Sequence, residues 1–305
     1  MKLSSSLPIV TFALWTAACS GATGTSIPEP PGAGSGSTPG TPTGAPAATS
    51  PAASPAFPGG PRPSGEGNVV IHVRASTRAV PHTDGLSGQT PREEYVGIRA
   101  LLLGTSKDDP DPLVVFDHQG YVEARLADGD DTIVARVPAS SLRAGRYTWA
   151  RTVVTHARYR VDATVHASGF SMPGEYENLV VLSDGTDVGG KKRMSGDVVS
   201  TFRGAGRVYG PTAATMPIGA WSSGGIALEV ANGRAAYVYP VNVVVDPSTK
   251  RQVDVLFDVN MHECFRWQDT PGPGYARHVW DVELGSWEPV MQFGANSFSL
   301  AYVTR

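Results

Sequence analysis

The sequence predicts an all-β protein, and three features of the chain after residue 66 carry that prediction. Short apolar or alternating runs recur at intervals of roughly 8–12 residues, as in sandwich and barrel folds. No apolar run keeps a helical period beyond one turn, for which Pro138–Leu142 is the best candidate. Turn-forming pairs separate the runs, namely Asp128-Gly129, Asp184-Gly185, Asn232-Gly233 and Asp246-Pro247. We therefore expect a β-sandwich, built as one large or two adjoining antiparallel sandwich units.

The N-terminal residues predict an export signal. Lys2 supplies a positive charge, and Leu7–Trp15 forms an apolar run of nine residues. Such a run is too short to span a bilayer, and the small residues Ala17 and Ala18 follow it as at a signal cleavage site. We expect residues 1–18 to be a signal peptide.

The end of this signal resembles a known motif. Thr16-Ala17-Ala18-Cys19 is similar to the lipobox of bacterial lipoproteins, in which the Cys becomes an acylated N-terminus. The resemblance implies lipidation of Cys19, membrane lipid as a partner, and anchoring in the bacterial cell envelope, at the outer membrane or cell surface. Thr16 stands where the lipobox usually has Leu. Ordinary cleavage after Ala18, leaving a free thiol, is the alternative.

Residues 19–66 are expected to be a disordered tether behind the lipid. From Gly21 to Glu66 the only large apolar side chains are Ile27 and Phe57, among Gly, Pro, Ser, Thr and Ala. Such a segment cannot bury enough apolar surface to offset the entropy of ordering it. In the flexible limit its reach is about 35–40 Å. Recognition of its Pro-rich stretches by a partner is the alternative.

Residues 67–305 are expected to form the β-rich domain. The clearest alternation puts Tyr159, Val161, Ala163 and Val165 on a dry face, with Arg158, Arg160, Asp162, Thr164 and His166 on a wet face. An internal join is expected in the Gly-rich span 203–225. The expected strands are Val69–Arg74, Val96–Leu103, Leu113–Phe116, Tyr121–Leu126, Thr132–Val137, Arg146–Thr155, Arg158–His166, Leu179–Leu182, Val198–Phe202, Ile226–Val230, Ala235–Val245, Gln252–Val259, His278–Leu284, Pro289–Phe293 and Phe298–Val303.

Two segments resemble parts of a known domain type. Leu142-Arg143-Ala144-Gly145-Arg146-Tyr147-Thr148, with Arg151 four residues after the Tyr, is similar to the start of a strand in transthyretin-like β-sandwich domains of bacterial lipoproteins. Val253-Asp254-Val255-Leu256-Phe257-Asp258 resembles a strand of the same kind of module. The resemblance covers about a third of the chain. It implies fold and location, and it brings no catalytic residue with it.

Charge and short motifs exclude some functions. The formal net charge of −3 gives no electrostatic basis for nucleic acid as a partner. Gly204–Gly210 lacks the spacing and the following helix of a dinucleotide-binding loop, and a flexible loop is expected there. Gly189–Arg193 lacks the Gly-Lys-Ser/Thr order of a phosphate loop. It is expected to be a solvated basic turn, with binding of an anionic partner as the alternative.

Acidic clusters in the expected loops are candidates for calcium. Calcium takes six to eight oxygen ligands, and closely spaced loop carboxylates supply them in many β-modules. Asp is also a preferred turn residue, which gives each cluster a structural alternative. The clusters comprise Asp108, Asp109 and Asp111, then Asp128, Asp130 and Asp131, and finally Asp184 and Asp187.

The densest set of reactive side chains lies near the C-terminus. In a strand, His262 and Cys264 would share one face, and with Asp269 or His278 they would suit zinc. The possible ligand or metal site comprises His262, Glu263, Cys264, Asp269 and His278. The chain lacks a Cys-x-x-Cys or His-Glu-x-x-His spacing and a Gly-x-Ser-x-Gly elbow. A buried structural Cys264 is therefore the favoured interpretation. The zinc site and a Cys–His nucleophile are the two alternatives.

Together these features predict a membrane-anchored, non-catalytic binding or structural module without a cofactor, for which an envelope protein or glycan is the expected partner. Aromatic side chains gathered near the C-terminus are possible contact residues, although core packing explains them equally well. They are Trp267, Tyr275, Trp280 and Trp287. The alternative is a hydrolase or metal-dependent enzyme with its site around His262–Asp281.

Overall fold

The computed structural model describes residues 67–305 except 168, 217, 220, 224–225 and 284–285. The signal peptide, Cys19 and the tether lie outside these residues. Within them the chain forms strands and one turn of 3-10 helix, Ala139–Ser141, so the predicted all-β fold is confirmed. The described residues contain no helix long and apolar enough to cross a lipid bilayer.

A small sheet covers one side of the domain. Its strand order is β20-β15-β1-β5, with bounds β1 (Val69–Ser76), β5 (Asp131–Val137), β15 (Val253–Asn260) and β20 (Ser297–Thr304). The central pair β1–β15 is parallel and in register from Val69↔Val253 to Ser76↔Asn260. This pair and the pair of β6 (Gly145–Ala167) with β17 (Asp281–Glu283) are parallel within otherwise antiparallel sheets. Because they are parallel, β1 and β15 end at the same edge of the sheet, and the segments that follow them start there.

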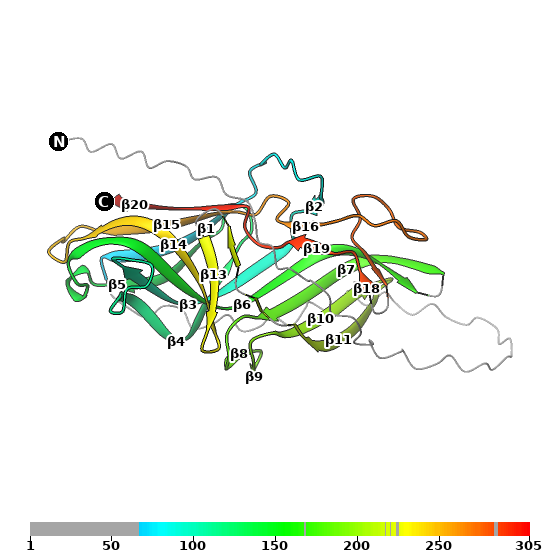
Figure 1. Cartoon of the computed structure of the whole chain (residues 1–305), viewed down its shortest axis with the longest axis horizontal. Coiled ribbons are helices and arrows are strands. Elements are labelled where there is room, and N and C mark those ends of the chain that lie inside the picture. The colour runs from blue at the N-terminus through cyan, green and yellow to red at the C-terminus, as the bar shows by residue number, and fades with distance from the viewer. Residues whose placement is uncertain (1–66, 168, 217, 220, 224–225, 284–285) are drawn as a thin grey trace, which may run out of the picture.

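The large sheet has eleven strands. Its path is β11-β10-β7-β6-β14-β13-β12, and β3, β4, β17 and β18 join it beside β6. Figure 1 shows the small sheet over β3 and β4 at one end, and β7, β10 and β11 extending to the other. The bounds are β3 (Glu93–Gly104), β4 (Leu113–Arg125), β6 (Gly145–Ala167), β7 (Phe170–Val181), β10 (Asp197–Gly204), β11 (Arg207–Thr215), β12 (Trp221–Ser223), β13 (Ile226–Ala231), β14 (Arg234–Val245), β17 (Asp281–Glu283) and β18 (Ser286–Trp287).

Strand β6 joins the two ends of the molecule, because it changes partner halfway. Along one edge it pairs with β14 up to Val154 and with β7 from His156 onward. Ser183 closes the gap between these partners: its hydroxyl donates to the Val154 carbonyl at 2.6 Å and accepts from the Ala235 N–H at 3.0 Å. Along its other edge, β6 pairs first with β3 and then with β17. The β17 pairing is parallel and starts at Asp281↔Thr164.

The apolar core has two main parts, one at each end of β6. The first lies between the small sheet and strands β3, β4, β6 and β14, and includes Ile71, Leu101, Val134 and Tyr147. The second packs Val161 of β6 against aromatic side chains from the C-terminal third. These are Phe265, Trp267, Trp280 and Phe293. Trp267 and Trp280 are thus core residues, whereas Trp287 is 49% exposed.

Two short sheets complete the fold. One has the order β19-β16-β2, with β2 (Ser87–Gln89), β16 (Phe265–Trp267) and β19 (Val290–Gln292). The other is the hairpin of β8 (Thr186–Val188) and β9 (Lys191–Arg193). Gly189 and Gly190 form its turn with φ of +64° and +74°, the left-handed region that glycine allows. The basic segment Gly189–Arg193 is therefore a hairpin turn and strand.

Several strand boundaries differ from the predicted ones. The two runs predicted between residues 113 and 126 form the single strand β4, and those between 146 and 166 form β6. Gly204–Gly210 is no flexible loop: it contains the turn of the β10–β11 hairpin, with β11 and β12 inside the span 203–225. The strand predicted at 278–284 is reduced to Asp281–Glu283 among the described residues.

The predicted wet face of β6 is only partly correct. Arg158 and Arg160 do form ion pairs with Glu177 and Glu175 on the neighbouring strand β7. His166, however, is only 7% exposed. It is covered because β17 pairs beside it and the loop before β17 brings the Tyr275 ring within 4.9 Å.

Candidate functional site

The candidate site lies where β1 and β15 leave the small sheet. Because the two strands run in parallel, the segments that follow them emerge side by side although they are separated by 184 positions. The Ser76 carbonyl accepts from the Met261 N–H at 2.8 Å, and the Arg78 carbonyl accepts from the Asn260 side-chain amide at 2.9 Å. This pairing brings residue 82 beside residues 262 and 263.

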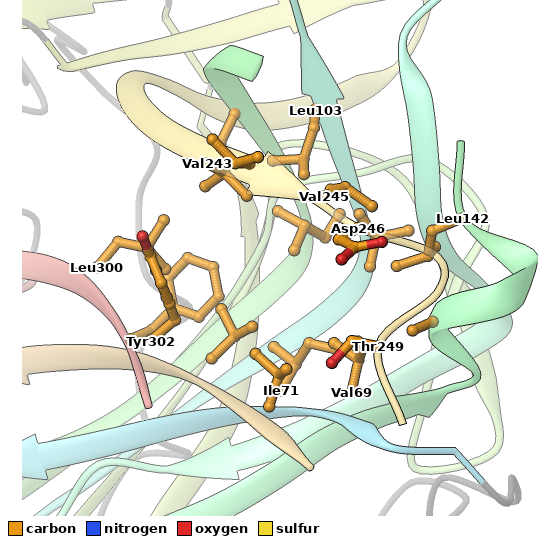
Figure 2. Close-up of a pocket in the computed structure, with 18 residues that line it drawn as sticks. Val69, Ile71, Leu103, Leu142, Val243, Val245, Asp246, Thr249, Leu300 and Tyr302 are labelled. Carbon is orange, nitrogen blue, oxygen red and sulfur yellow. The ribbon is translucent and has the colours of Figure 1, made fainter. Parts of the chain in front are cut away.

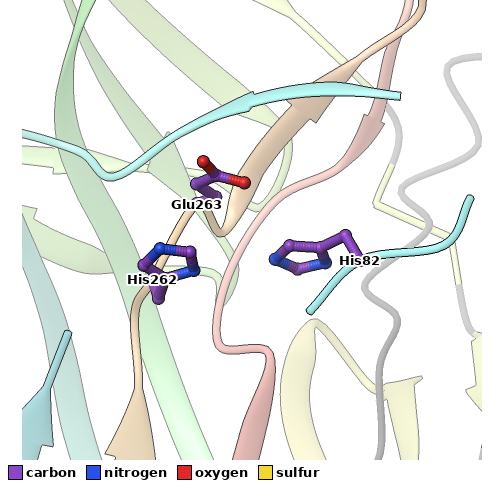
Figure 3. Close-up of side chains that lie close together, drawn as sticks. All are labelled: His82, His262 and Glu263. Atoms are coloured by element: carbon purple, nitrogen blue, oxygen red, sulfur yellow. The ribbon is translucent and has the colours of Figure 1, made fainter. Parts of the chain in front are cut away.

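His82, His262 and Glu263 form a cluster with possible metal-ligand atoms within 4.8 Å of one another. The two imidazole rings are stacked, with centroids 6.0 Å apart and an interplanar angle of 8°. Figure 3 shows the two rings and the Glu263 carboxylate gathered in one place, with His82 coming from a different segment. It is the only cluster of three such groups in the described part of the chain.

The surroundings of His82 favour its neutral form, which is the form that binds a metal. Burial lowers the pKa of the His82 imidazole, and the positive charge of Arg266 lowers it further. Among the described residues, His82 Nε2 is buried without a hydrogen-bond partner. A buried ring nitrogen without a partner is a candidate metal ligand.

Arg266 lies beside the cluster and is almost fully buried, at 1% exposure. Asp84 neutralises it through a two-point contact: Nε donates to Oδ2 at 3.0 Å, and Nη2 contacts Oδ1. Nη2 also donates to the Leu86 carbonyl at 3.0 Å, and Nη1 lies 3.5 Å from Glu263 Oε2. Arg266 thus fixes both the segment that carries His82 and the carboxylate of Glu263.

The predicted strand geometry at residues 262–264 is wrong. Glu263 has φ of +44° in a turn between β15 and β16, and its N–H donates to Thr90 Oγ1 at 2.9 Å. The turn removes the alternation that would have put His262 and Cys264 on one face. His262 and Glu263 share the cluster, and Cys264 faces the core instead.

Cys264 is fully buried and lies beside a buried acid. Its Sγ donates to Glu94 Oε2 at 3.6 Å. Burial raises the pKa of the Cys264 thiol well above its usual value, and the neighbouring Glu94 adds to the effect. The thiol is a core group in this setting, which supports the structural interpretation of Cys264 over a zinc ligand or nucleophile.

Asp269 and His278 meet at a third residue, Ser87, rather than at His262. Ser87 Oγ donates to Asp269 Oδ2 at 2.6 Å and lies 2.8 Å from His278 Nδ1. The Trp267 indole N–H also donates to Asp269, at 3.1 Å. Because the hydroxyl proton of Ser87 goes to the carboxylate, His278 is left as a donor to the hydroxyl oxygen. The possible site predicted around residues 262–278 is therefore divided into three separate places.

Most of the acidic residues predicted as calcium ligands have hydrogen-bond or ion-pair partners in the protein. Asp109 Oδ2 accepts from the N–H and hydroxyl of Thr105, and Asp111 pairs with Arg143 at 2.6 Å. The second cluster likewise binds its own loop and neighbours: Asp128 accepts from the Thr77 N–H, Asp130 from the Ala127 N–H, and Asp131 contacts His72. In the third cluster, Asp184 accepts from the Ser195 N–H at 2.8 Å, and the Asp187 carbonyl accepts from Tyr121.

An apolar cavity of about 90 Å³ lies in the first core, between the small sheet and the large sheet. Valine and leucine side chains such as Val69, Leu103, Val243 and Leu300 line it, with Asp246 and Thr249 at one side (Figure 2). Small-molecule sites usually offer about 300–1,000 Å³. This volume is too small for such a site, so we treat the cavity as a packing void.

Comparisons with known protein families, with curated proteins and with solved structures gave no match. Sequence reasoning identifies His262 and Glu263 but misses His82, Ser87 and Glu94. No local pattern marks these three, because each meets its partner only through pairing of distant strands.

Proposed function

We propose that this protein is an exported, lipid-anchored envelope module whose β-domain binds a divalent cation of the zinc class through His82, His262 and Glu263. The observation that carries the metal proposal is the convergence of two imidazoles and one carboxylate, with a buried and unpartnered Nε2 on His82. Imidazole nitrogen and carboxylate oxygen are common zinc ligands.

The cluster supplies three ligands, and zinc usually takes four. The remaining position is open to water or to an atom of a bound partner. A carboxylate or imidazole from an envelope protein, or a glycan carboxylate, fits such a position chemically. The metal ion thus gives the predicted binding module a defined point of contact with its partner. The sequence alone predicts a binding surface without a cofactor.

The anchor part of the proposal is supported by the sequence alone. Lys2, the apolar run Leu7–Trp15 and the small residues before Cys19 form the pattern of a lipoprotein signal. The composition of residues 21–66 suits a spacer between the lipid and the β-domain. Transthyretin-like lipoprotein domains remain the family that the residues around Gly145 and Val253 resemble.

Titration of the purified, metal-free full chain with zinc tests the proposal. We expect one bound ion per chain, and we expect His82→Ala to weaken binding by more than about 100-fold, since loss of an outer-shell partner alone costs about 10–100-fold. His118→Ala is the matched control, because His118 Nε2 contacts the Val134 carbonyl away from the cluster. Absence of stoichiometric zinc, or equal losses in both variants, would contradict the metal proposal.

A further inference from the structure

We propose that Ser171, His166 and Asp281 form a second site, independent of the metal cluster, in which Ser171 is a nucleophile toward accessible carboxylic esters. Ser171 Oγ lies 2.9 Å from His166 Nδ1, and His166 Nε2 lies 2.7 Å from Asp281 Oδ1. The three side chains thus form a continuous hydrogen-bonded chain in the order nucleophile, base and orienting carboxylate.

The fold explains why the three residues meet. Ser171 and His166 are directly opposite one another in the β6–β7 hairpin, so their side chains share a face of the sheet. Strand β17 pairs with the other edge of β6 and places Asp281 opposite Thr164, two residues before His166. The site is therefore built on three adjacent strands, which hold side chains more firmly than loops do.

The hydrogen bonds fix which nitrogen of His166 carries the proton. The carboxylate of Asp281 accepts, so Nε2 carries the hydrogen and Nδ1 presents its lone pair to Ser171. Asp281 Oδ2 is itself held by the Ala276 N–H at 2.9 Å. Asp281 and His166 are 1% and 7% exposed, whereas Ser171 is exposed to solvent. A sheltered base next to an accessible hydroxyl is the arrangement that nucleophilic catalysis requires.

The covering loop comes close to the nucleophile at Gly274. Gly274 has φ of +81°, and a Cβ at this position would lie 3.2 Å from Ser171 Oγ and 3.5 Å from His166 Nδ1. A Cβ there would be tight against Ser171 Oγ and in ordinary van der Waals contact with His166 Nδ1, and the backbone conformation already favours glycine. Glycine at this position therefore avoids a close contact with the exposed Ser171 hydroxyl.

The reaction follows from these contacts. Ser171 Oγ attacks the ester carbonyl carbon, and its proton passes to His166 Nδ1 as the new carbon–oxygen bond forms. His166 returns that proton to the leaving alcohol oxygen as the ester bond breaks, which leaves an acyl group on Ser171. Water then attacks the acyl carbon, with its proton passing through His166 back to Ser171, and the free acid leaves. Asp281 is a positioning residue that holds His166 in the required tautomer.

Ser87 offers an internal comparison, since it also lies beside a histidine and an aspartate. There the hydroxyl donates to Asp269, and His278 has no lone pair directed at a hydroxyl proton. Ser87 is also only 2% exposed. The order of groups and the accessibility both distinguish Ser171 from Ser87.

Labelling of the purified full chain with a fluorophosphonate, followed by peptide mass spectrometry, tests the proposal. We expect the label on Ser171, its loss in Ser171→Ala, a rate lower by about 100-fold or more in His166→Gln, and an unchanged rate in Ser87→Ala. Thermal melting of each variant shows that it is folded, and Ser171→Ala changes an exposed side chain. An unlabelled Ser171 in the folded wild type, or an equal rate in His166→Gln, would overturn the proposal.

Two further measurements distinguish a nucleophilic Ser171 from a structural hydrogen-bond chain and from metal-dependent activity. In Asp281→Asn we expect the pH–rate profile of labelling to change, which a purely structural role of Asp281 would not produce. Labelling should also persist after removal of metal ions with a chelator. Labelling that disappears on chelation and returns with zinc would assign the activity to the metal cluster and overturn the proposal.

Discussion

The thiol of Cys264 donates to the carboxyl of Glu94 across 3.6 Å in the interior of the domain. Glu94 comes from β3 in the large sheet, and Cys264 lies between β15 of the small sheet and β16. The contact therefore links an acid and a thiol that are 170 positions apart. Both groups titrate in surroundings that disfavour their charged forms, and this gives two predictions.

The first prediction concerns the reactivity of Cys264. Because burial raises the pKa of its thiol, little thiolate is present at neutral pH. In a Cys19→Ala background, which leaves one thiol in the chain, we expect slow reaction with a thiol reagent when folded and fast reaction in denaturant. Cys264→Ser should reduce stability by about 1–3 kcal/mol. Fast labelling of the native chain would show that Cys264 is not a core group.

The second prediction concerns Glu94 and pH. Burial raises the pKa of the Glu94 carboxyl from 4.5 to about 8. The pKa of Glu94 is higher in the folded state than in the unfolded state. Its contribution to stability is therefore full below pH 4.5 and is lost as the pH rises toward 8. Glu94→Gln mimics the neutral acid and should reduce the loss of stability between these pH values by on the order of 2–4 kcal/mol. Urea unfolding of the wild type and Glu94→Gln at both pH values measures this loss of stability. An equal loss in the two proteins would refute the prediction.

A third prediction concerns the ion pair between Arg266 and Asp84. Asp84→Ala leaves a guanidinium that is nearly fully buried without its main counter-charge. We expect a loss of about 2–4 kcal/mol in the free energy of unfolding, because an unpaired buried charge is costly. The matched control is Asp117→Ala, whose partner Arg99 is more exposed and whose removal should cost less than about 1 kcal/mol. Similar losses in both variants would argue against the buried pair.

A fourth prediction concerns the anchor. Cys19→Ala removes the thiol that the lipobox-like segment offers for acylation. In a bacterial host we expect this variant to incorporate no labelled fatty acid and to leave the membrane fraction. The same experiment with Cys264→Ala is the control and should leave labelling unchanged. Fatty acid incorporated into Cys19→Ala would disprove the anchor.

The strands are predictable where the pattern is local. Alternation identifies Val253–Val259, and the strand expected from 235 to 245 matches β14 closely. The sequence does not show where a strand changes partner, so its pattern predicts two strands in place of β6. Beside the point where β6 changes partner, Ser183 hydrogen bonds to Val154 and Ala235, which are distant from it in the chain.

The candidate site is only half predictable for a related reason. His262 and Glu263 are adjacent in the sequence and stand out together, whereas His82 reaches them only because β1 and β15 pair in parallel. The assumption of a strand at residues 262–264 also fails, since the positive φ of Glu263 separates Cys264 from its neighbours. Local spacing cannot show either effect.

The most direct test of the metal proposal is the X-ray absorption spectrum of the zinc-loaded full chain. We predict a first shell of nitrogen and oxygen atoms at about 2.0–2.2 Å, with two imidazoles and no sulfur. His82→Ala should lose one imidazole contribution from that spectrum, and His118→Ala should retain both. A sulfur atom at about 2.3 Å would place the metal at Cys264, and a spectrum of fully hydrated zinc would show that the cluster binds no metal. Either result would contradict the site formed by His82, His262 and Glu263.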